Sequence, residues 1–364
     1  MTDSEKLRSR RHLLQALRPR IAPLEQVREV DPFRTPPVSS STVRLSTRAM
    51  ACDFSVIMNP GNPRHVEPAG SVLEGIHDVE EWLSIYRSDS LISEINRRAA
   101  SEAVTVSQPM LELLDQAMAI HTWTAGAFDL ASGALGQLWK RCRQQQQIPD
   151  QHQIDEVLSR SGSQYLSVDI EAQAVRFSRA GLVLDPGAIG KGFALDAAVD
   201  ALLAADNGPR EFLLHGGQSS LVARGTHHHL PGWPIGIGNP LLTNQRLGMM
   251  LLTDKAMSTS GSNIQFFRYQ GRRYGHILDP QTGWPVEGML SVTVVADSAA
   301  VADALSTAFF VMGIEKARAC CDNLPGIGAI LIPFPTKGRK VRPTVVGIPA
   351  EQLFWDPAQV ELQV

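Results

Sequence analysis

Residues 182–217 read LVLDPGAIGKGFALDAAVDALLAADNGPREFLLHGG, and they contain the most informative corner of the chain. The spacing predicts an apolar strand at 182–184, a glycine-rich turn and a helix over about 190–205. A second apolar strand at 212–214 ends at the Gly-Gly pair. Glycines let backbone amides approach a phosphate, and a helix N-terminus favours anions. The corner is therefore typical of an anion site and equally of a tight turn. It is not a P-loop, because Asp185 and Gly192 stand where that motif needs glycine and Ser or Thr.

The rest of the chain mixes strands and helices. Helices are expected over 71–84, 108–125 and 299–312, the last ending at Gly313. Strands are expected near 54–58, 233–238, 246–253, 264–269, 290–296, 327–333 and 342–347, and a pair of short strands over 166–177. Because several strands follow one another directly, the pattern predicts an α+β fold with antiparallel sheets and packed helices.

The composition excludes several classes of protein. Of the 364 residues, 43% are hydrophobic, and 34 basic and 37 acidic residues give a net charge of -3. This is not the composition of a collagen, a coiled coil or a disordered chain, and it offers no overall attraction for nucleic acid. No apolar run reaches the roughly 18–20 residues that span a bilayer, so no transmembrane segment is expected.

The cysteines and the first residues indicate a compartment. The four cysteines show no CxxC spacing, which favours a reducing environment over a disulfide framework. The opening sequence, MTDSEKLRSRRHLLQALRPR, has a twin-arginine pair but neither the apolar core nor the cleavage site of a secretory signal. We therefore expect a cytoplasmic protein, with export the less favoured alternative.

Three further segments carry candidate chemistry, each with a structural alternative. Asp303, Ser306 and Thr307 share one face of a predicted helix, and such hard oxygen donors suit Mg²⁺. The same pattern is also that of an ordinary polar helix turn. His276 precedes the turn DPQTG and is either a general base or a cap of that turn. Tyr86, at a predicted helix exit, either stacks on a planar ring or packs in the core.

The order of these segments resembles the ApbE family, the flavin transferases also called FAD:protein FMN transferases. The resemblance rests on MACDFSVIM (50–58), YRSDSLISEIN (86–96), GAFDLASGALGQLW (126–139), LDPGAIGKGFALD (184–196), HGGQSS (215–220), STSG (258–261), GHILDPQTGWPV (275–286) and SVTVVADSAAVADALSTAFFVMG (291–313). It covers about 46–335. We accordingly expect a flexible arm over 1–45, a flavin transferase domain over 46–350 and a C-terminal tail over 351–364. The implied fold is ApbE-like and related to tunnelling-fold architectures.

The resemblance also implies a site. FAD would be bound by Met50, Tyr86, Ala127, Phe128, Asp129, Asp185, Lys191 and Leu278, with Tyr86 against the isoalloxazine face. Mg²⁺ would be held by the backbone carbonyl of Ala188 with the side chains of Asp303, Ser306 and Thr307. His276 would be the catalytic base.

The implied reaction is a Mg²⁺-dependent transfer of FMN from FAD to a Ser or Thr hydroxyl of a target flavoprotein, with AMP released. Two alternatives remain open: hydrolysis of FAD to FMN and AMP, and FAD binding without catalysis. The chain departs from the family pattern at Ala51 and Cys52, where Met-Gly-Thr is common, and at Gln218, where an acidic residue is usual. Many members are exported lipoproteins, whereas no lipobox cysteine stands near this start.

Overall fold

The computed structural model describes residues 30–262, 266–335, 338 and 340–362. From Pro32 onward these residues belong to one compact unit. The arm expected over 1–45 falls largely outside the described residues, so the boundaries expected at 45 and 350 stay predictions. No helix in the described part of the chain is long and apolar enough to cross a membrane.

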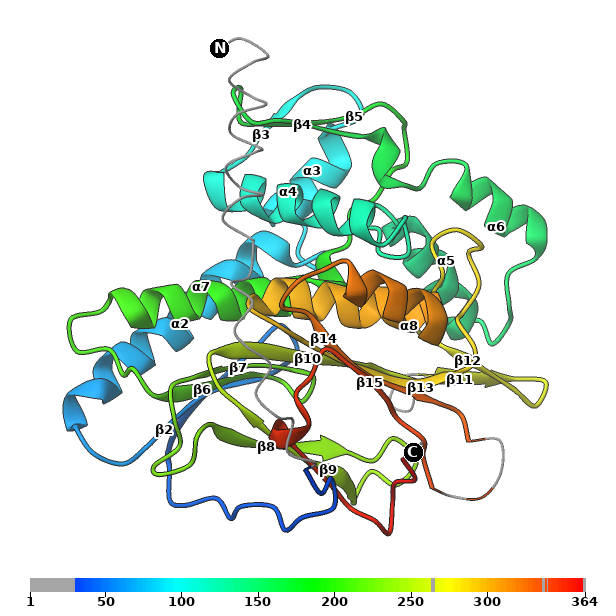
Figure 1. Cartoon of the computed structure of the whole chain (residues 1–364). Coiled ribbons are helices and arrows are strands. Elements are labelled where there is room, and N and C mark those ends of the chain that lie inside the picture. Colours follow the sequence, from blue (N-terminus) through cyan, green and yellow to red (C-terminus); the bar gives the residue numbers. More distant parts are fainter. Residues whose placement is uncertain (1–29, 263–265, 336–337, 339, 363–364) are drawn as a thin grey trace, which may run out of the picture. The chain divides into compact units, whose positions relative to one another are not determined.

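An eight-stranded sheet organises the unit, with strands in the order β1-β2-β6-β7-β10-β13-β14-β15 (Figure 1). Every neighbouring pair in it is antiparallel, which confirms the α+β prediction. Its strands are β1 (Val43–Ala49), β2 (Cys52–Met58), β6 (Phe212–Gly216), β7 (Ser220–Arg224), β10 (Lys255–Gly261), β13 (Met289–Ala296), β14 (Gly328–Pro333) and β15 (Thr344–Val346).

The two faces of this sheet pack on different layers (Figure 1). Three helices, α2 (Val66–Leu83), α7 (Gly190–Ala204) and α8 (Ala299–Asp322), contact one face. The other face packs on a small sheet of β16 (Leu353–Trp355), β9 (Arg246–Leu252) and β8 (Trp233–Gly238). Side chains alternate along a strand, so Val294 of β13 joins the core under the helices and Val295 joins the core between the sheets. This double coverage explains why all of β13 is buried.

The remaining elements surround these layers. The helices are α3 (Leu91–Arg98), α4 (Gln108–Trp123), α5 (Gly133–Gln144) and α6 (Gln151–Leu158). One small sheet holds β3 (Val104–Thr105), β5 (Ala174–Phe177) and β4 (Leu166–Asp169), and a hairpin pairs β11 (Phe266–Tyr269) with β12 (Arg272–Gly275). The short 3-10 turns are η1 (Pro63–His65), η2 (Ser163–Tyr165), η3 (Pro186–Ala188) and η4 (Ala350–Gln352).

The strand predicted at 182–184 is wrong. Only an isolated parallel bridge between Ser132 and Val183 forms there. Beside this bridge, the Asn96 side chain forms hydrogen bonds with both backbone groups of Leu184. The Asn96 amide accepts from the Leu184 N–H at 2.7 Å and donates to the Leu184 carbonyl at 3.0 Å. The segment is extended because an amide side chain, and not a neighbouring strand, satisfies its backbone. The break predicted at Gly313 is confirmed by its φ of 72° within α8.

Candidate active site

The glycine corner is the turn η3 and the start of α7. Asp185 caps this turn, since its carboxylate accepts the Gly187 N–H at 2.9 Å. Burial raises the pKa of the Asp185 carboxyl, while the Gly187 amide and the Lys140 ammonium act in the opposite direction. The corner therefore presents backbone amides and a helix start beside a carboxyl that is costly to ionise.

Gly192 lets α7 and α8 approach closely. A Cβ at Gly192 would lie 2.1 Å from the Ala299 carbonyl oxygen, which no side chain tolerates. Asp196, one turn further along α7, holds the start of α8 by accepting from the Ser298 hydroxyl and the Ala299 N–H at 2.7 Å, and from the Ala300 N–H at 2.9 Å. These contacts fix the register of the two helices. Asp196 is not among the residues expected from the sequence. Its signal was weak, because α7 carries a second aspartate, Asp200, one turn further on.

This register brings Lys191 to Asp303. The Lys191 Nζ atom lies 3.3 Å from Asp303 Oδ2, and the Gly192 N–H donates to the same oxygen at 3.3 Å. Asp303 is 4% exposed, and the hydroxyls of Ser220 and Ser258 donate to its other oxygen. A buried carboxylate thus receives one cation and three further donors, as its ionised form requires.

Lys191, Asp303, Ser220 and Ser258 form a polar patch. Ser306 and Thr307 extend this polar patch along α8. The Ser306 hydroxyl donates to the Asp303 carbonyl at 2.9 Å. The Ser260 hydroxyl on β10 lies 2.8 Å from the hydroxyl of Ser306 and 3.0 Å from that of Thr307. The three α8 residues named from the sequence are therefore brought together. Beneath them lie serines of the sheet that belong to the quoted segments HGGQSS (215–220) and STSG (258–261), but to which the sequence assigned no role.

The oxygen atoms of Asp303, Ser306 and Thr307 are of the kind that a hard divalent cation binds. Among the described residues, no group of three or more His, Cys, Asp or Glu side chains is placed to hold a metal ion. Any cation here would need hydroxyl and carbonyl oxygens, which Mg²⁺ accepts when one carboxylate and substrate phosphates complete its shell. Cα atoms of η3, which contains Ala188, lie within 8 Å of Cα atoms of α8. The oxygen chemistry and this proximity both suit Mg²⁺.

Tyr86 follows α2 and is 78% exposed. The Lys140 Nζ atom of α5 lies 4.6 Å from the centre of its ring, and the same ammonium acts electrostatically on Asp185. Tyr86 is thus on the surface and not in the core, which removes the core-packing alternative. An exposed aromatic face next to a cation is suited to a planar, electron-poor ring.

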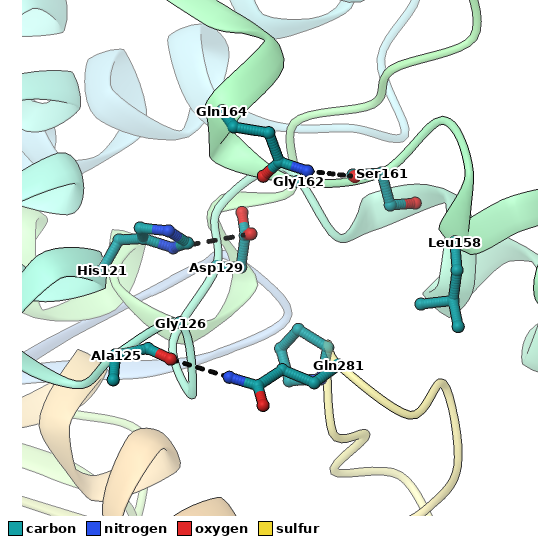
Figure 2. Close-up of a pocket in the computed structure, with 10 residues that line it drawn as sticks. His121, Ala125, Gly126, Asp129, Leu158, Ser161, Gly162, Gln164 and Gln281 are labelled. Atoms are coloured by element: carbon teal, nitrogen blue, oxygen red, sulfur yellow. Dashed lines mark hydrogen bonds and ion pairs between the residues drawn. The ribbon is translucent and has the colours of Figure 1, made fainter.

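Asp129 lies in a cavity of about 360 Å³, shown in Figure 2. Its carboxylate accepts from the Ser163 hydroxyl at 2.6 Å and from the Ala131 N–H at 2.8 Å, and it lies 3.5 Å from His121 Nδ1. Gln281, after the DP turn, donates to the Ala125 carbonyl across the same cavity (Figure 2). The Asp129 carboxylate therefore uses most of its hydrogen-bond acceptor capacity within the protein, where it links its own loop to Ser163.

The other residues named for FAD occupy varied positions. Ala127 and Phe128 are buried in the main core. The Phe128 N–H donates to the Thr124 hydroxyl at 3.2 Å, and the Phe128 carbonyl lies 3.0 Å from His121 Nδ1. Leu278 is half-buried and packs on the cluster formed by α5 and α6. His276 is exposed immediately after β12. The Met50 side chain packs beside the glycine corner. Its Cε atom lies 3.6 Å from the point that a Cβ on Gly190 would occupy.

The three departures from the family pattern lie near one another. Met50 and Ala51 form a two-residue turn between β1 and β2, with φ of 50° and 59°. Cys52 is the next residue. Its Sγ atom lies 3.2 Å from the point that a Cβ on Gly217 would occupy. Gly217 directly precedes Gln218 in the turn between β6 and β7. Burial raises the pKa of the Cys52 thiol, and Lys191 opposes the rise. The departures therefore adjoin the Lys191 end of the polar patch.

Comparison with known proteins identifies relatives over most of the chain. The model of the ApbE family matches residues 50–331. The FAD:protein FMN transferase of Treponema pallidum is 34% identical, covering 74% of this chain and 80% of the relative. The enzyme of the same name from Klebsiella pneumoniae is 32% identical, covering 75% of this chain and 83% of the relative.

Solved structures agree with these matches. A crystal structure of the ApbE protein of Thermotoga maritima has a TM-score of 0.72 and 29% identity, and the match covers 80% of this chain and 94% of that one. The apo flavinyl transferase ApbE of Pseudomonas stutzeri has a TM-score of 0.72 and 28% identity, with 88% and 99% covered.

Proposed function

The chain belongs to the ApbE family of transferases, and we propose that it transfers FMN from FAD to a serine or threonine hydroxyl of an acceptor protein, releasing AMP. The observation that carries the proposal is the 3.3 Å contact between Lys191 and Asp303, which joins the glycine corner to the oxygen donors of α8. A cation, a helix start and a buried carboxylate together suit a metal-bound diphosphate.

The Lys191 ammonium and the α7 start would bind the phosphates of FAD. Lys191 is long and partly exposed, so it can contact an anion while remaining near Asp303. Asp303, Ser306, Thr307 and the Ala188 carbonyl would hold Mg²⁺. When bound, this ion supplies positive charge that neutralises the diphosphate and the leaving AMP.

Tyr86 would place the flavin. Lys140 lies over the Tyr86 ring and also acts on Asp185, so a flavin stacked on Tyr86 would lie near the glycine corner. Met50, beside Gly190, would support the ring from the β1–β2 turn. Stacking of this kind orients a substrate without taking part in bond making.

His276 would accept the proton of the acceptor hydroxyl. The hydroxyl oxygen forms a bond to the FMN-side phosphorus, and the bond from that phosphorus to the AMP oxygen breaks. The hydroxyl proton passes to the imidazole, so no covalent enzyme intermediate is required. The exposed position of His276 is open to an approaching protein chain, which supports the proposed role.

The test is an assay with FAD, Mg²⁺ and a candidate acceptor flavoprotein. We expect a fluorescent flavin band at the acceptor in a denaturing gel, with one AMP released for each label. AMP and free FMN without a labelled acceptor would instead show hydrolysis. If neither label nor AMP appears with any acceptor, while FAD binds, the protein is a flavin-binding member without transferase activity.

A further inference from the structure

A row of serines on the central sheet lies directly beneath the oxygens of α8. Ser258 of β10 and Ser220 of β7 are opposite one another in register, with their hydroxyls 3.0 Å apart. Both donate to Asp303 Oδ1, at 3.0 Å from Ser258 and 3.2 Å from Ser220. Each serine is 1% exposed, so water does not compete for these bonds.

The spacing of the strand matches that of the helix. Ser258 and Ser260 are two residues apart on β10, and this repeat spans about 6.7 Å on one face. Asp303 and the Ser306–Thr307 pair are one turn apart on α8, which rises about 5.4 Å. Ser258 therefore contacts Asp303 while Ser260 contacts Ser306 and Thr307.

We infer that Ser220, Ser258 and Ser260 are positioning residues that orient the α8 oxygens toward a divalent cation. The inference rests on the proposed function, and it assigns a role to side chains that would not touch the cation. Ser220 and Ser258 fix one carboxylate oxygen of Asp303, and Ser260 fixes the hydroxyl rotamers of Ser306 and Thr307.

The hydrogen-bond inventory explains why Ser260 is needed. A hydroxyl that gives a lone pair to a metal still carries a proton, which must be donated elsewhere. The Ser306 hydroxyl donates to the Asp303 carbonyl at 2.9 Å, so Ser260 is the donor in its 2.8 Å contact with Ser306. Because the single Ser260 proton is used there, Thr307 donates to Ser260 Oγ at 3.0 Å. With these protons placed, one lone pair on the Ser306 hydroxyl and two on the Thr307 hydroxyl are left available for a cation.

Thr259 provides a matched control on the same strand. It lies between the two serines, so its side chain points to the opposite face of the sheet. There its hydroxyl pairs with that of Thr293 at 2.8 Å. Thr259→Val removes a partly buried hydroxyl with one side-chain contact, whereas Ser260→Ala removes a partly buried hydroxyl with two. Unlike Ser260→Ala, Thr259→Val leaves the α8 oxygens untouched.

The experiment measures binding of Mn²⁺, used as the probe ion, to the full-length protein with FAD present and no acceptor. The free-ion signal in electron paramagnetic resonance reports the dissociation constant. We expect Ser258→Ala and Ser260→Ala each to weaken Mn²⁺ binding about tenfold, because removing a hydrogen-bond partner of a metal ligand commonly has an effect of this size. Thr259→Val should leave the dissociation constant for Mn²⁺ within about twofold of the wild-type value. FAD affinity without metal should not change in any of the three variants.

The Mn²⁺ binding of the wild type and of the two serine variants distinguishes the positioning role from the metal assignment itself. If the wild type binds Mn²⁺ and both serine variants bind it equally well, the inference is overturned and the proposed function stands. If the wild type binds no Mn²⁺, the metal assignment fails and this inference fails with it. Circular dichroism checks folding, and should Ser258→Ala not fold, the less buried Ser260→Ala carries the test.

Discussion

The Lys191 ammonium lies 3.3 Å from Asp303 Oδ2, although 112 residues separate the two in the chain. The pair links the start of α7 to the first turns of α8 and is the point at which the glycine corner meets the oxygen donors. Only 23% of the lysine side chain and 6% of the aspartate side chain are exposed, so the pair is far more shielded than the exposed ion pairs elsewhere.

Replacing Gly192 by alanine should disturb this link. The added Cβ would meet the Ala299 carbonyl at 2.1 Å, so α7 and α8 must separate. We expect Gly192→Ala to lower the free energy of unfolding by about 2–3 kcal/mol and to weaken FAD binding. Urea denaturation and flavin fluorescence measure the two effects.

The matched control is Gly70→Ala on α2, where an added Cβ meets nothing within 4 Å. That change should raise stability by roughly 0.5–1 kcal/mol through helix propensity. Equal effects of the two substitutions would mean that the close approach of α7 and α8 is unimportant.

The β1–β2 turn should become more stable with glycine at residue 51. Ala51 has a φ of 59°, in the left-handed region, where a Cβ costs about 1 kcal/mol. We therefore expect Ala51→Gly to raise the melting temperature by a few degrees, corresponding to about 0.5–1 kcal/mol. The exposed α7 position Ala201 is the control, because Ala201→Gly should lower stability by about 1 kcal/mol. A drop in melting temperature for Ala51→Gly would contradict this account of the turn.

His215 on β6 should make the fold sensitive to acid. Burial, with a smaller contribution from Arg44, lowers the pKa of this imidazole from 6.5 to about 4. The unfolded chain therefore binds a proton that the folded chain does not, and stability is present above pH 6.5 and lost as the pH falls toward 4. The full loss is about 3 kcal/mol.

Guanidine denaturation from pH 7.5 to 4.5 checks this acid sensitivity. The His215→Asn variant should lose less stability across the range than the wild type, because it has no group to charge there. The exposed His229→Gln variant is the control and should follow the wild type. Parallel curves for His215→Asn and the wild type would rule out His215 as the source.

Much of the fold could be predicted from periodicity. The helices around 71–84 and 108–125 have apolar residues at helical spacing, and α2 and α4 appear there. The strand at 233–238 is found with those same limits as β8. The segment 182–184 was misassigned because a short apolar run does not show whether its backbone pairs with a strand or with a side chain such as Asn96.

The site was only partly predictable for a related reason. Spacing on one helix identified Asp303, Ser306 and Thr307, since helical neighbours are local in sequence. The serines beneath them come from β7 and β10, and their register depends on strand pairing that no local pattern records. The role of Asp129 near a flavin stays a prediction. The contact of its carboxylate with Ser163, 34 residues further along the chain, could not be read from any local pattern.

The most direct test of the account is Mg²⁺-dependent AMP release by the Asp303→Asn variant. Asparagine keeps the shape of the side chain and removes the charge that would hold the ion beside Lys191. We predict that the variant loses at least about a hundredfold of the Mg²⁺-stimulated rate, and that Asp297→Asn, which changes a carboxylate 79% exposed, retains it. AMP release by Asp303→Asn at the wild-type rate and with the wild-type Mg²⁺ dependence would contradict the account.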